Sequence, residues 1–283
     1  MDSNNRTTHN KSSKEKQAAA ASILAFKFKR EKKLKEDLRP HFKQLGKGVK
    51  KYYSSNGKLP SFEPHRNAVK SIINAHYIDT ATLASTTIRD NFKPIPDDER
   101  LQSLIDANIE VDADDRSDFA ADSISGTTKD NYKDAIKMSI AAAAVAGAVL
   151  SKENIADDIS DDFEDTIEDR LDLISQMETG VAADDGKANE IDALDDTDAE
   201  FDDGTSLADY KTQKTWIAIL DSQTRPWHRS ADGQTVDYDQ PYIVDGEELM
   251  EPRDDSLGAS DENLMGCRCE SIENWEWKMR KPI

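Results

Sequence analysis

The chain has 283 residues, of which 36% are hydrophobic and 33% are charged, and its formal net charge is −20. So low an apolar content predicts that some segments are extended or pack on partners. The longest apolar run, residues 138–150, is much shorter than the roughly 20 residues that span a bilayer. We therefore expect a buried helix there and no membrane partner.

The charge is unevenly distributed along the chain. Residues 1–70 carry 18 Lys and Arg against 6 Asp and Glu, whereas residues 152–203 carry 3 against 21. Such polarity indicates different partners for the two ends. Residues 1–16 are polar with almost nothing to bury, which predicts a disordered tail.

Residues 17–180 form a region that we expect to be helical, basic at first and then acidic. Apolar residues recur at helical spacing from Gln17 until Pro40, where we expect the first helix to end. Its basic residues include Lys27, Lys29, Arg30, Lys32, Lys33 and Lys35. With interleaved aromatic residues they are candidates for binding nucleic-acid phosphates, and a solvated or protein-docking helix face is the equal alternative.

Further helices follow in chain order. A second helix should begin after Pro64, residues 93–118 read as a loop with a brief helix, and an Ala-rich helix should run over about 130–150. The clearest helical stripe is made of Ile155, Ile159, Phe163, Ile167, Leu171, Ile174 and Met177. Its other faces are acidic, so this helix needs burial or a basic partner. Gly180 should end it, and residues 181–205 should be an acidic linker.

Residues 206–283 change in pattern and predict a small mixed α/β module, which makes the fold class α+β. Trp216–Leu220 is a strand or the last turn of a helix that begins near Ser206, and Tyr242–Val244 is a short strand. Asp232-Gly233 is a hairpin-type turn, and Asp245-Gly246 turns again. We expect the C-terminal tryptophans, Trp275 and Trp277, to pack back on this module.

The module contains a rare set of chemically distinctive side chains. They are Asp221, Arg225, His228, Cys267, Arg268 and Cys269. We favour a metal-free polar cluster, in which Asp221 pairs with Arg225, His228 bonds to backbone and the cysteines are small buried residues. A zinc site formed by His228, Cys267 and Cys269 stays open. So does a Cys–His catalytic pair, although no nucleophile motif accompanies it.

The order of these residues resembles one protein family. Lys214-Thr215-Trp216, Asp221 to His228, Asp232-Gly233 and Gly266-Cys267-Arg268-Cys269 are similar to the bacteriophage head-morphogenesis family. That family comprises minor head proteins like protein F of phage Mu and the minor capsid protein of phage SPP1. The resemblance covers about 70 residues, and Gly266 departs from it because Asn often precedes the Cys-Arg-Cys element.

The resemblance implies a minor capsid protein, present in few copies in the virion, that acts in head assembly at or near the portal. Its implied partners are the portal protein and the inner capsid, with packaged DNA as a further partner of the basic segment. It would reside in the host cytoplasm during assembly and take part in packaging or ejection. Such proteins are not generally enzymes, although some relatives carry fused toxin domains. The alternatives are a DNA-binding internal virion protein and a metal-dependent hydrolase that uses the His/Cys cluster.

Overall fold

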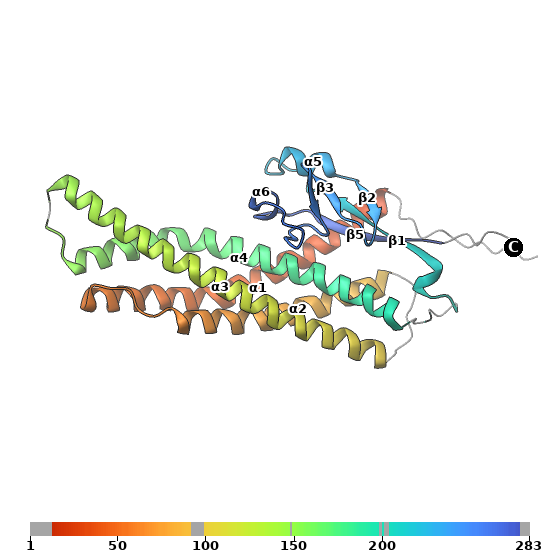
Figure 1. Cartoon of the computed structure of the whole chain (residues 1–283), viewed down its shortest axis with the longest axis horizontal. Coiled ribbons are helices and arrows are strands. Elements are labelled where there is room, and N and C mark those ends of the chain that lie inside the picture. Colours follow the sequence, from red (N-terminus) through yellow and green to blue (C-terminus); the bar gives the residue numbers. More distant parts are fainter. Residues whose placement is uncertain (1–12, 92–98, 148, 198–199, 201–203, 278–283) are drawn as a thin grey trace, which may run out of the picture. The chain divides into compact units, whose positions relative to one another are not determined.

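The computed structural model describes residues 13–91, 99–147, 149–197, 200 and 204–277. In this part of the chain, long helices precede short helices and antiparallel strands (Figure 1). The long helices are α1 (Ser13–Asn56), α2 (Glu63–Asn91), α3 (Glu99–Ala146) and α4 (Lys152–Thr197). The predicted α+β class is thereby confirmed, with a mostly helical N-terminal region and a small mixed C-terminal module.

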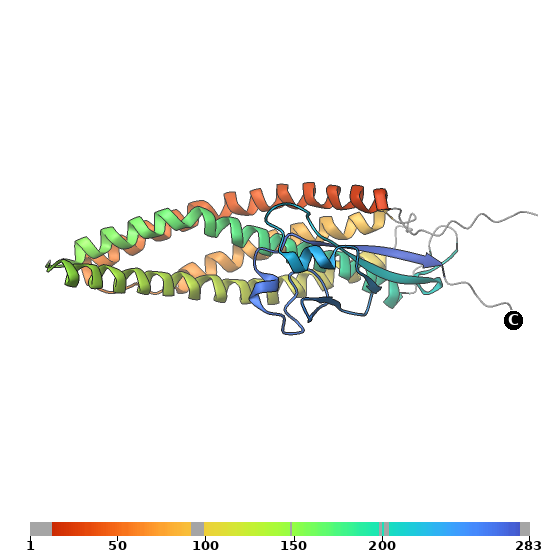
Figure 2. The same ribbon diagram turned by 90° about the horizontal axis from the view of Figure 1, so that it is seen from above.

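The C-terminal module is built on antiparallel strands. Its elements are η1 (Leu207–Asp209), β1 (Tyr210–Ile217), α5 (Pro226–Ala231), β2 (Thr235–Asp237), β3 (Tyr242–Val244), β4 (Glu247–Leu249), α6 (Asp261–Leu264) and β5 (Glu270–Trp277). One sheet has the order β2-β1-β5, and β3 pairs with β4 in another. Figures 1 and 2 show β1 and β5 side by side, and they pair from Tyr210 opposite Trp277 to Ile217 opposite Glu270. The strand at 242–244 is confirmed.

The two predicted turns differ in type. Asp245 and Gly246 both have positive φ, 53° and 82°, and join β3 to β4 in the two-residue hairpin that such angles favour. Asp232 instead has φ −55° and Gly233 φ 81°. These values define a type II turn. It leads from α5 into β2, so the hairpin prediction at this position is wrong.

The described chain divides into two compact units. Unit 1 comprises Met1–Lys29, Thr80–Glu110 and Gly180–Ile283, and unit 2 comprises Arg30–Asp79 and Val111–Thr179. In unit 2 the predicted stripe of α4 is buried from Ile155 to Ile174. Aromatic rings meet it: Tyr132 stacks on Phe163 at 5.0 Å, and Phe42 stacks on Phe163 at 6.4 Å. This stripe therefore forms the core of unit 2, as its spacing predicts.

Ion pairs in unit 2 join basic helices to acidic ones. The pairs are Lys35 and Arg39 with Glu168, Lys50 with Asp157, Arg66 with Asp118 and Asp122, and Lys70 with Asp114 and Asp118. Arg39 binds both oxygens of Glu168, at 2.9 and 2.8 Å. The requirement of the acidic helix for a basic partner is thus met by α1. Much of the charge polarity, which we had interpreted as distinct partners for the two ends, is balanced inside this unit.

Three expected helix boundaries in the first half of the chain are wrong. Helix α1 continues through Pro40, since Leu38 and Phe42 on either side of the proline are fully buried and outweigh its missing N–H. Helix α3 begins at Glu99 and includes most of the predicted loop 93–118, because Leu101, Ile105 and other apolar residues are buried. The predicted tail at 1–16 is helical from Ser13, and residues 1–12 lie outside the described part.

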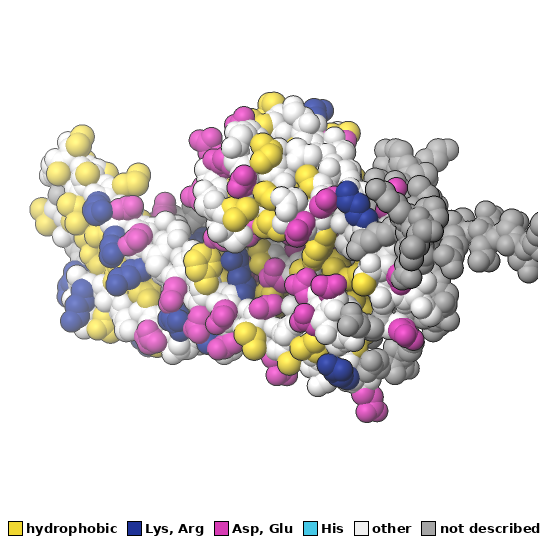
Figure 3. Space-filling model, turned by 45° about the vertical axis from the view of Figure 1, so that its right-hand side comes forward, with side chains coloured by type: hydrophobic (Ala, Val, Ile, Leu, Met, Phe, Trp, Pro, Cys, Tyr) yellow, Lys and Arg dark blue, Asp and Glu magenta, His cyan; other side chains and the backbone are white. Residues whose placement is uncertain are grey.

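The Ala-rich run 138–150 is helical to Ala146, but the expectation that it is buried is wrong. Met138 is 70% exposed, Val145 91% and Val149 95%. Figure 3 shows hydrophobic side chains gathered where α3 ends. We call the exposed side chains of Met138, Ile140, Val145 and Val149 the α3 tip. None of the described helices combines the length and apolar content needed to cross a membrane.

The predicted acidic linker, residues 181–205, is helical as far as Thr197, and Gly180 does not end α4. Residues 198–199 and 201–203 lie outside the described part. Gly180 and Gly186 provide space for close packing of α4. A Cβ at Gly186 would lie 2.6 Å from the Cα of Ala81 on α2, and one at Gly180 would lie 2.7 Å from the Cδ of Arg253. The composition predicts a linker, but the segment is helical, and Gly180 and Gly186 allow neighbouring groups to approach closely.

We expect Gly186→Ala to destabilise the protein by about 2 kcal/mol or more, because the added methyl overlaps the α2 backbone. Gly48→Ala is the matched control, since a Cβ there meets nothing within 4 Å. It should stabilise α1 by up to about 1 kcal/mol. Urea unfolding followed by circular dichroism measures both changes. Equal stability of the two variants would contradict the close approach of α4 to Ala81.

Candidate functional site

The candidate site lies in unit 1, where loops between short elements bring the distinctive side chains together. His228 is on α5, which begins with Pro226 at its first position, a place that tolerates proline. Cys267 and Cys269 directly precede β5, after a turn in which Gly266 has φ 66°. Both cysteines are free and buried. The cluster is thus held between α5 and the start of β5.

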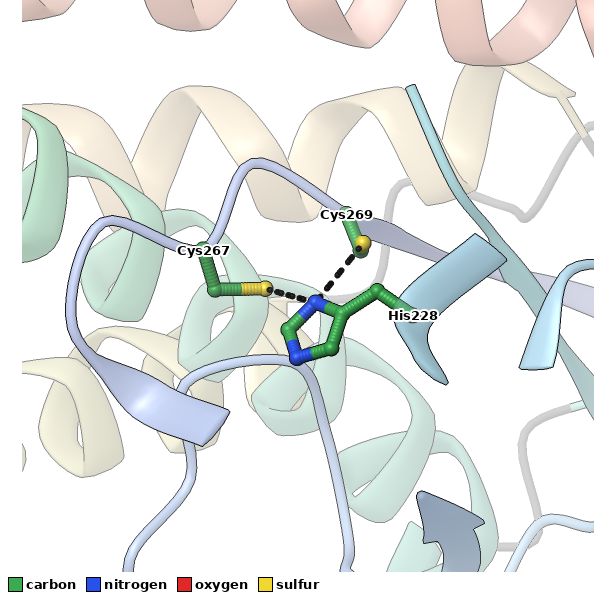
Figure 4. Close-up of side chains that lie close together, drawn as sticks. All are labelled: His228, Cys267 and Cys269. Carbon is green, nitrogen blue, oxygen red and sulfur yellow. Dashed lines mark hydrogen bonds between the residues drawn. The ribbon is translucent and has the colours of Figure 1, made fainter. Parts of the chain in front are cut away.

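The three predicted metal ligands converge on one point (Figure 4). His228 Nδ1 lies 3.6 Å from Cys267 Sγ and 3.4 Å from Cys269 Sγ. All three side chains are buried, and their donor atoms lie within 4.8 Å of one another. The expected hydrogen bond of His228 to the backbone is not formed in the described part of the chain. Its Nδ1 faces two sulfur atoms instead.

Asn263 on α6 determines which nitrogen of His228 carries the proton. Its Nδ2 donates to the carbonyl of Val244 and to Glu247 Oε2, at 3.2 and 2.6 Å. The amide oxygen therefore faces His228 Nε2, 3.2 Å away, and accepts its proton. This arrangement leaves the lone pair of Nδ1 directed at the two thiols.

The two thiols differ in proton affinity. The S–H of Cys269 directed at Cys267 holds the pKa of Cys267 well below its usual range, against the opposing effect of burial. The pKa of Cys269 is raised for the same reason, and burial adds to the rise.

The predicted pair of Asp221 and Arg225 does not form. Asp221 instead binds Arg268, with 2.8 Å between carboxylate and guanidinium, and also accepts from the backbone N–H of Gln223. Arg225 donates to the carbonyl of Met265. The reason is local: Asp221 caps its own turn, and that turn directs the carboxylate toward the Cys-Arg-Cys loop. The polar cluster exists, with a different pairing.

A small cavity adjoins the His/Cys cluster. Its volume is about 20 Å³, and its wall includes His228 and both cysteines. Arg225 and Arg268 also line it. This volume suffices for one water molecule or ion.

Arg253 is the residue that sequence reasoning missed. Its Nη1 donates to the carbonyls of Cys267 and Cys269, at 3.0 and 2.7 Å, and its Nη2 binds Asp184 of α4. Arg253 has φ 76°, a strained angle for a residue other than glycine. Its guanidinium thus fixes the backbone of the Cys-x-Cys loop. No sequence signal pointed to it beyond an arginine in a loop next to Pro252.

Further buried charges surround Asp184 in unit 1. Lys27 Nζ donates to Asp184 at 3.2 Å and to Glu270 of β5 at 2.7 Å. Lys187 lies 3.2 Å from Asp184 and 3.4 Å from Glu273. We call Lys27, Asp184, Lys187, Arg253, Glu270 and Glu273 the buried charge network. The side chains of all these residues are at most 5% exposed.

Asp184 and Lys187 stay ionised because opposite charges surround each of them. Burial acts to raise the pKa of Asp184, but Lys27, Arg253 and Lys187 outweigh it and hold that pKa well below its usual range. Burial acts to lower the pKa of Lys187, and Glu273 and Asp184 raise it nonetheless. Acid or base far from neutrality is needed to discharge either group.

Most of the candidate DNA-binding residues form ion pairs within the chain. Lys27 is buried in the charge network, so its assignment as a phosphate contact is wrong. Arg30 pairs with Asp79, Lys32 with Glu36, Lys33 with Asp37, and Lys35 with Glu168 and Asp172. Lys29 is exposed. The helical spacing was right, but the partners are this chain's own carboxylates.

Comparison with known proteins gives one partial similarity. The chain is 36% identical over 61 residues to an NAD(+)–arginine ADP-ribosyltransferase, EFV, of Enterococcus faecalis. Those residues are 22% of this chain and 12% of that protein, so the chain matches about an eighth of the relative's length. No protein-family model matches the chain. No solved structure matches it either.

Glu251, next to the network, makes the stability of unit 1 depend on pH. Its Oε1 lies 3.5 Å from Lys214 Nζ, and its buried Oε2 has no hydrogen-bond partner among the described residues. Burial raises its pKa to about 7, although Lys187 and Lys214 act to lower it. Because the folded pKa exceeds the unfolded one, the protonated form stabilises the fold. That contribution is complete below about pH 4.5 and is lost as the pH rises through 7.

We therefore expect Glu251→Gln, which resembles the protonated acid, to be more stable than the wild type at pH 8 by about 3 kcal/mol and equal to it near pH 4.5. Denaturant titrations from pH 4.5 to 8 measure the difference in free energy of unfolding between the variant and the wild type. The other titrating groups are the same in both proteins, so their contributions cancel. Glu248→Gln, on the exposed face of β4, is the control and should leave the profile unchanged. A constant difference between wild type and Glu251→Gln at all pH values would contradict the assignment.

Proposed function

We propose that the protein is a minor head protein of a tailed bacteriophage that acts in head assembly at or near the portal. The proposal rests on the convergence of the residues that carry the family resemblance. His228 meets Cys267 and Cys269, and Asp221 meets Arg268. The residues of the resemblance, although far apart in sequence, therefore build one site, and this convergence supports the proposal.

The contacts of the site support a structural role rather than an enzymatic one. Arg253 and Arg225 donate to backbone carbonyls, and Asp221 holds a turn and Arg268. Groups that are satisfied by backbone and by each other stabilise a loop and have little capacity left for substrate. We therefore propose a protein that is not an enzyme.

The similarity to the ADP-ribosyltransferase is compatible with this proposal. A shared stretch that covers 12% of the relative is what two proteins with a common small module and different remaining parts would give. The transfer of ADP-ribose is the activity of that protein, and 61 residues are much shorter than an ordinary catalytic domain. The match therefore favours a shared module over a shared reaction.

The α3 tip supports partners among proteins. Met138, Ile140 and Val145 are 70%, 48% and 91% exposed on the same helix. Large apolar side chains gathered at an exposed end of a helix are typical of protein interaction sites. We propose that the tip contacts the portal or the inner capsid. Packaged DNA is the weaker candidate partner, because most of the basic residues at its proposed site already bind carboxylates.

The first expected result is the presence of the protein, in few copies, in purified procapsids and virions. Quantitative mass spectrometry gives its ratio to the major capsid protein, and cross-linking should join it to the portal. Heads assembled without portal should lack it. Absence from both particles would refute the proposal. Transfer of ADP-ribose from NAD to arginine by the purified protein would show that the enzymatic alternative is right.

The second expected result concerns the α3 tip. Val145→Asp should reduce incorporation into procapsids about tenfold or more, because a buried unpaired carboxylate at an interface costs more than 1.4 kcal/mol. The fold should be unchanged, since the side chain is exposed. Lys137→Glu, an exposed charge change on the same helix, is the control and should be incorporated normally. Equal incorporation of both variants would exclude the tip as the contact surface.

A further inference from the structure

The His/Cys cluster has the geometry of a metal site. In a tetrahedral zinc site with Zn–S of about 2.3 Å and Zn–N of about 2.0 Å, nitrogen and sulfur ligands lie about 3.5 Å apart. The distances from His228 Nδ1 to the two sulfur atoms are 3.6 and 3.4 Å. Both sulfur–nitrogen edges of such a tetrahedron are therefore already present.

Only one of the two short contacts of His228 Nδ1 with sulfur can be a hydrogen bond to the imidazole lone pair. A neutral imidazole offers one lone pair, on the nitrogen without a proton, and Asn263 assigns that proton to Nε2. His228 Nδ1 can therefore accept from one thiol, whereas two lie beside it. A metal ion would bind all three donors at once.

Charge balance leads to the same ion. Two thiolates and a neutral imidazole with a divalent cation form a neutral unit, which is the form that a buried site tolerates. Cys and His are the ligands that zinc prefers among the common divalent metals. Cys267 and Cys269 are 1% and 3% exposed, and His228 is 2% exposed.

Supporting contacts around the ligands are also in place. Metal-binding histidines usually donate their second N–H to an oxygen, as His228 does to Asn263, which Glu247 holds in turn. Arg253 fixes the carbonyls of both cysteines. The ligand loop is thus pre-organised from both sides.

We propose that His228, Cys267 and Cys269 bind one zinc ion, whose fourth position faces the adjoining cavity and takes a water molecule. The cavity has room for one such molecule, and the side chains of Arg225 and Arg268 line its wall. This inference is independent of the proposed role in head assembly. In the cell the ion would fasten α5 to the start of β5.

Metal content and affinity of the full-length protein test the proposal. We expect one zinc per chain in protein purified without chelator. Stripped protein, titrated with zinc against a chromophoric chelator, should bind with a Kd of about 50 nM or tighter. Cobalt in place of zinc should give thiolate charge-transfer absorption and tetrahedral ligand-field bands. A Kd weaker than about 10 μM would overturn the proposal.

Variants assign the ligands. Cys267→Ser, Cys269→Ser and His228→Gln should each weaken zinc binding about 100-fold or more. Asn263→Leu, which removes only the support of His228, should weaken it about 10- to 100-fold. His41→Gln, a change to a histidine in unit 2, is the control and should bind as the wild type does. Unchanged affinity in the three ligand variants would also overturn the proposal.

A measurement on the wild type covers the case in which the ligand variants fail to fold. Alkylation followed by mass spectrometry should label Cys267 and Cys269 faster in stripped protein than in zinc-loaded protein, because without the metal local opening of the ligand loop exposes free thiols. Circular dichroism should show that the stripped protein remains folded while it is labelled. Equal labelling rates with and without zinc would contradict metal binding at these thiols.

Discussion

The contact on which unit 1 depends most is the buried ion pair between Arg253 and Asp184. Arg253 reaches from a loop to α4 and on the way binds the carbonyls of Cys267 and Cys269. Asp184 in turn meets Lys27 of α1. Removing one partner of a buried pair typically costs about 3–5 kcal/mol, because the other charge is left without compensation. One guanidinium therefore couples the position of the cysteines to two helices.

Unit 2 follows a different physical principle. Its core is apolar, around the stripe of α4 and the rings of Phe42, Tyr132 and Phe163, and its ion pairs lie at the periphery. Partly exposed pairs stabilise little individually, but they remove the repulsion that would oppose an acidic helix. The net charge of −20 is thus compatible with long helices packed together.

The sequence predicted what periodicity and turn chemistry determine. The stripe from Ile155 to Ile174, the strand at 242–244 and the turn at Asp245-Gly246 follow from local patterns. Prediction from the sequence failed where contacts between residues far apart in the chain determine the structure. The helix from Gly180 to Thr197 has an acidic, glycine-containing sequence. Its order depends on the burial of Ile191 and Leu194 and on contacts with Ala81, Arg253 and Lys27. In the site, proximity of His228 to the cysteines was predictable from their types, whereas the exchange of Arg225 for Arg268 as partner of Asp221 depends on loop direction.

Gly180 limits how residues 206–283 could be transferred to another protein. The motif-bearing stretch from residue 206 onward contains Arg253 and Glu270, but their counter-charges, Asp184 and Lys27, lie far upstream. Even the space for the guanidinium comes from Gly180. Transplanted alone, the stretch would arrive with unmatched charges. A protein that acquires this stretch must already have a helix with a carboxylate at the position of Asp184 and a glycine at the position of Gly180.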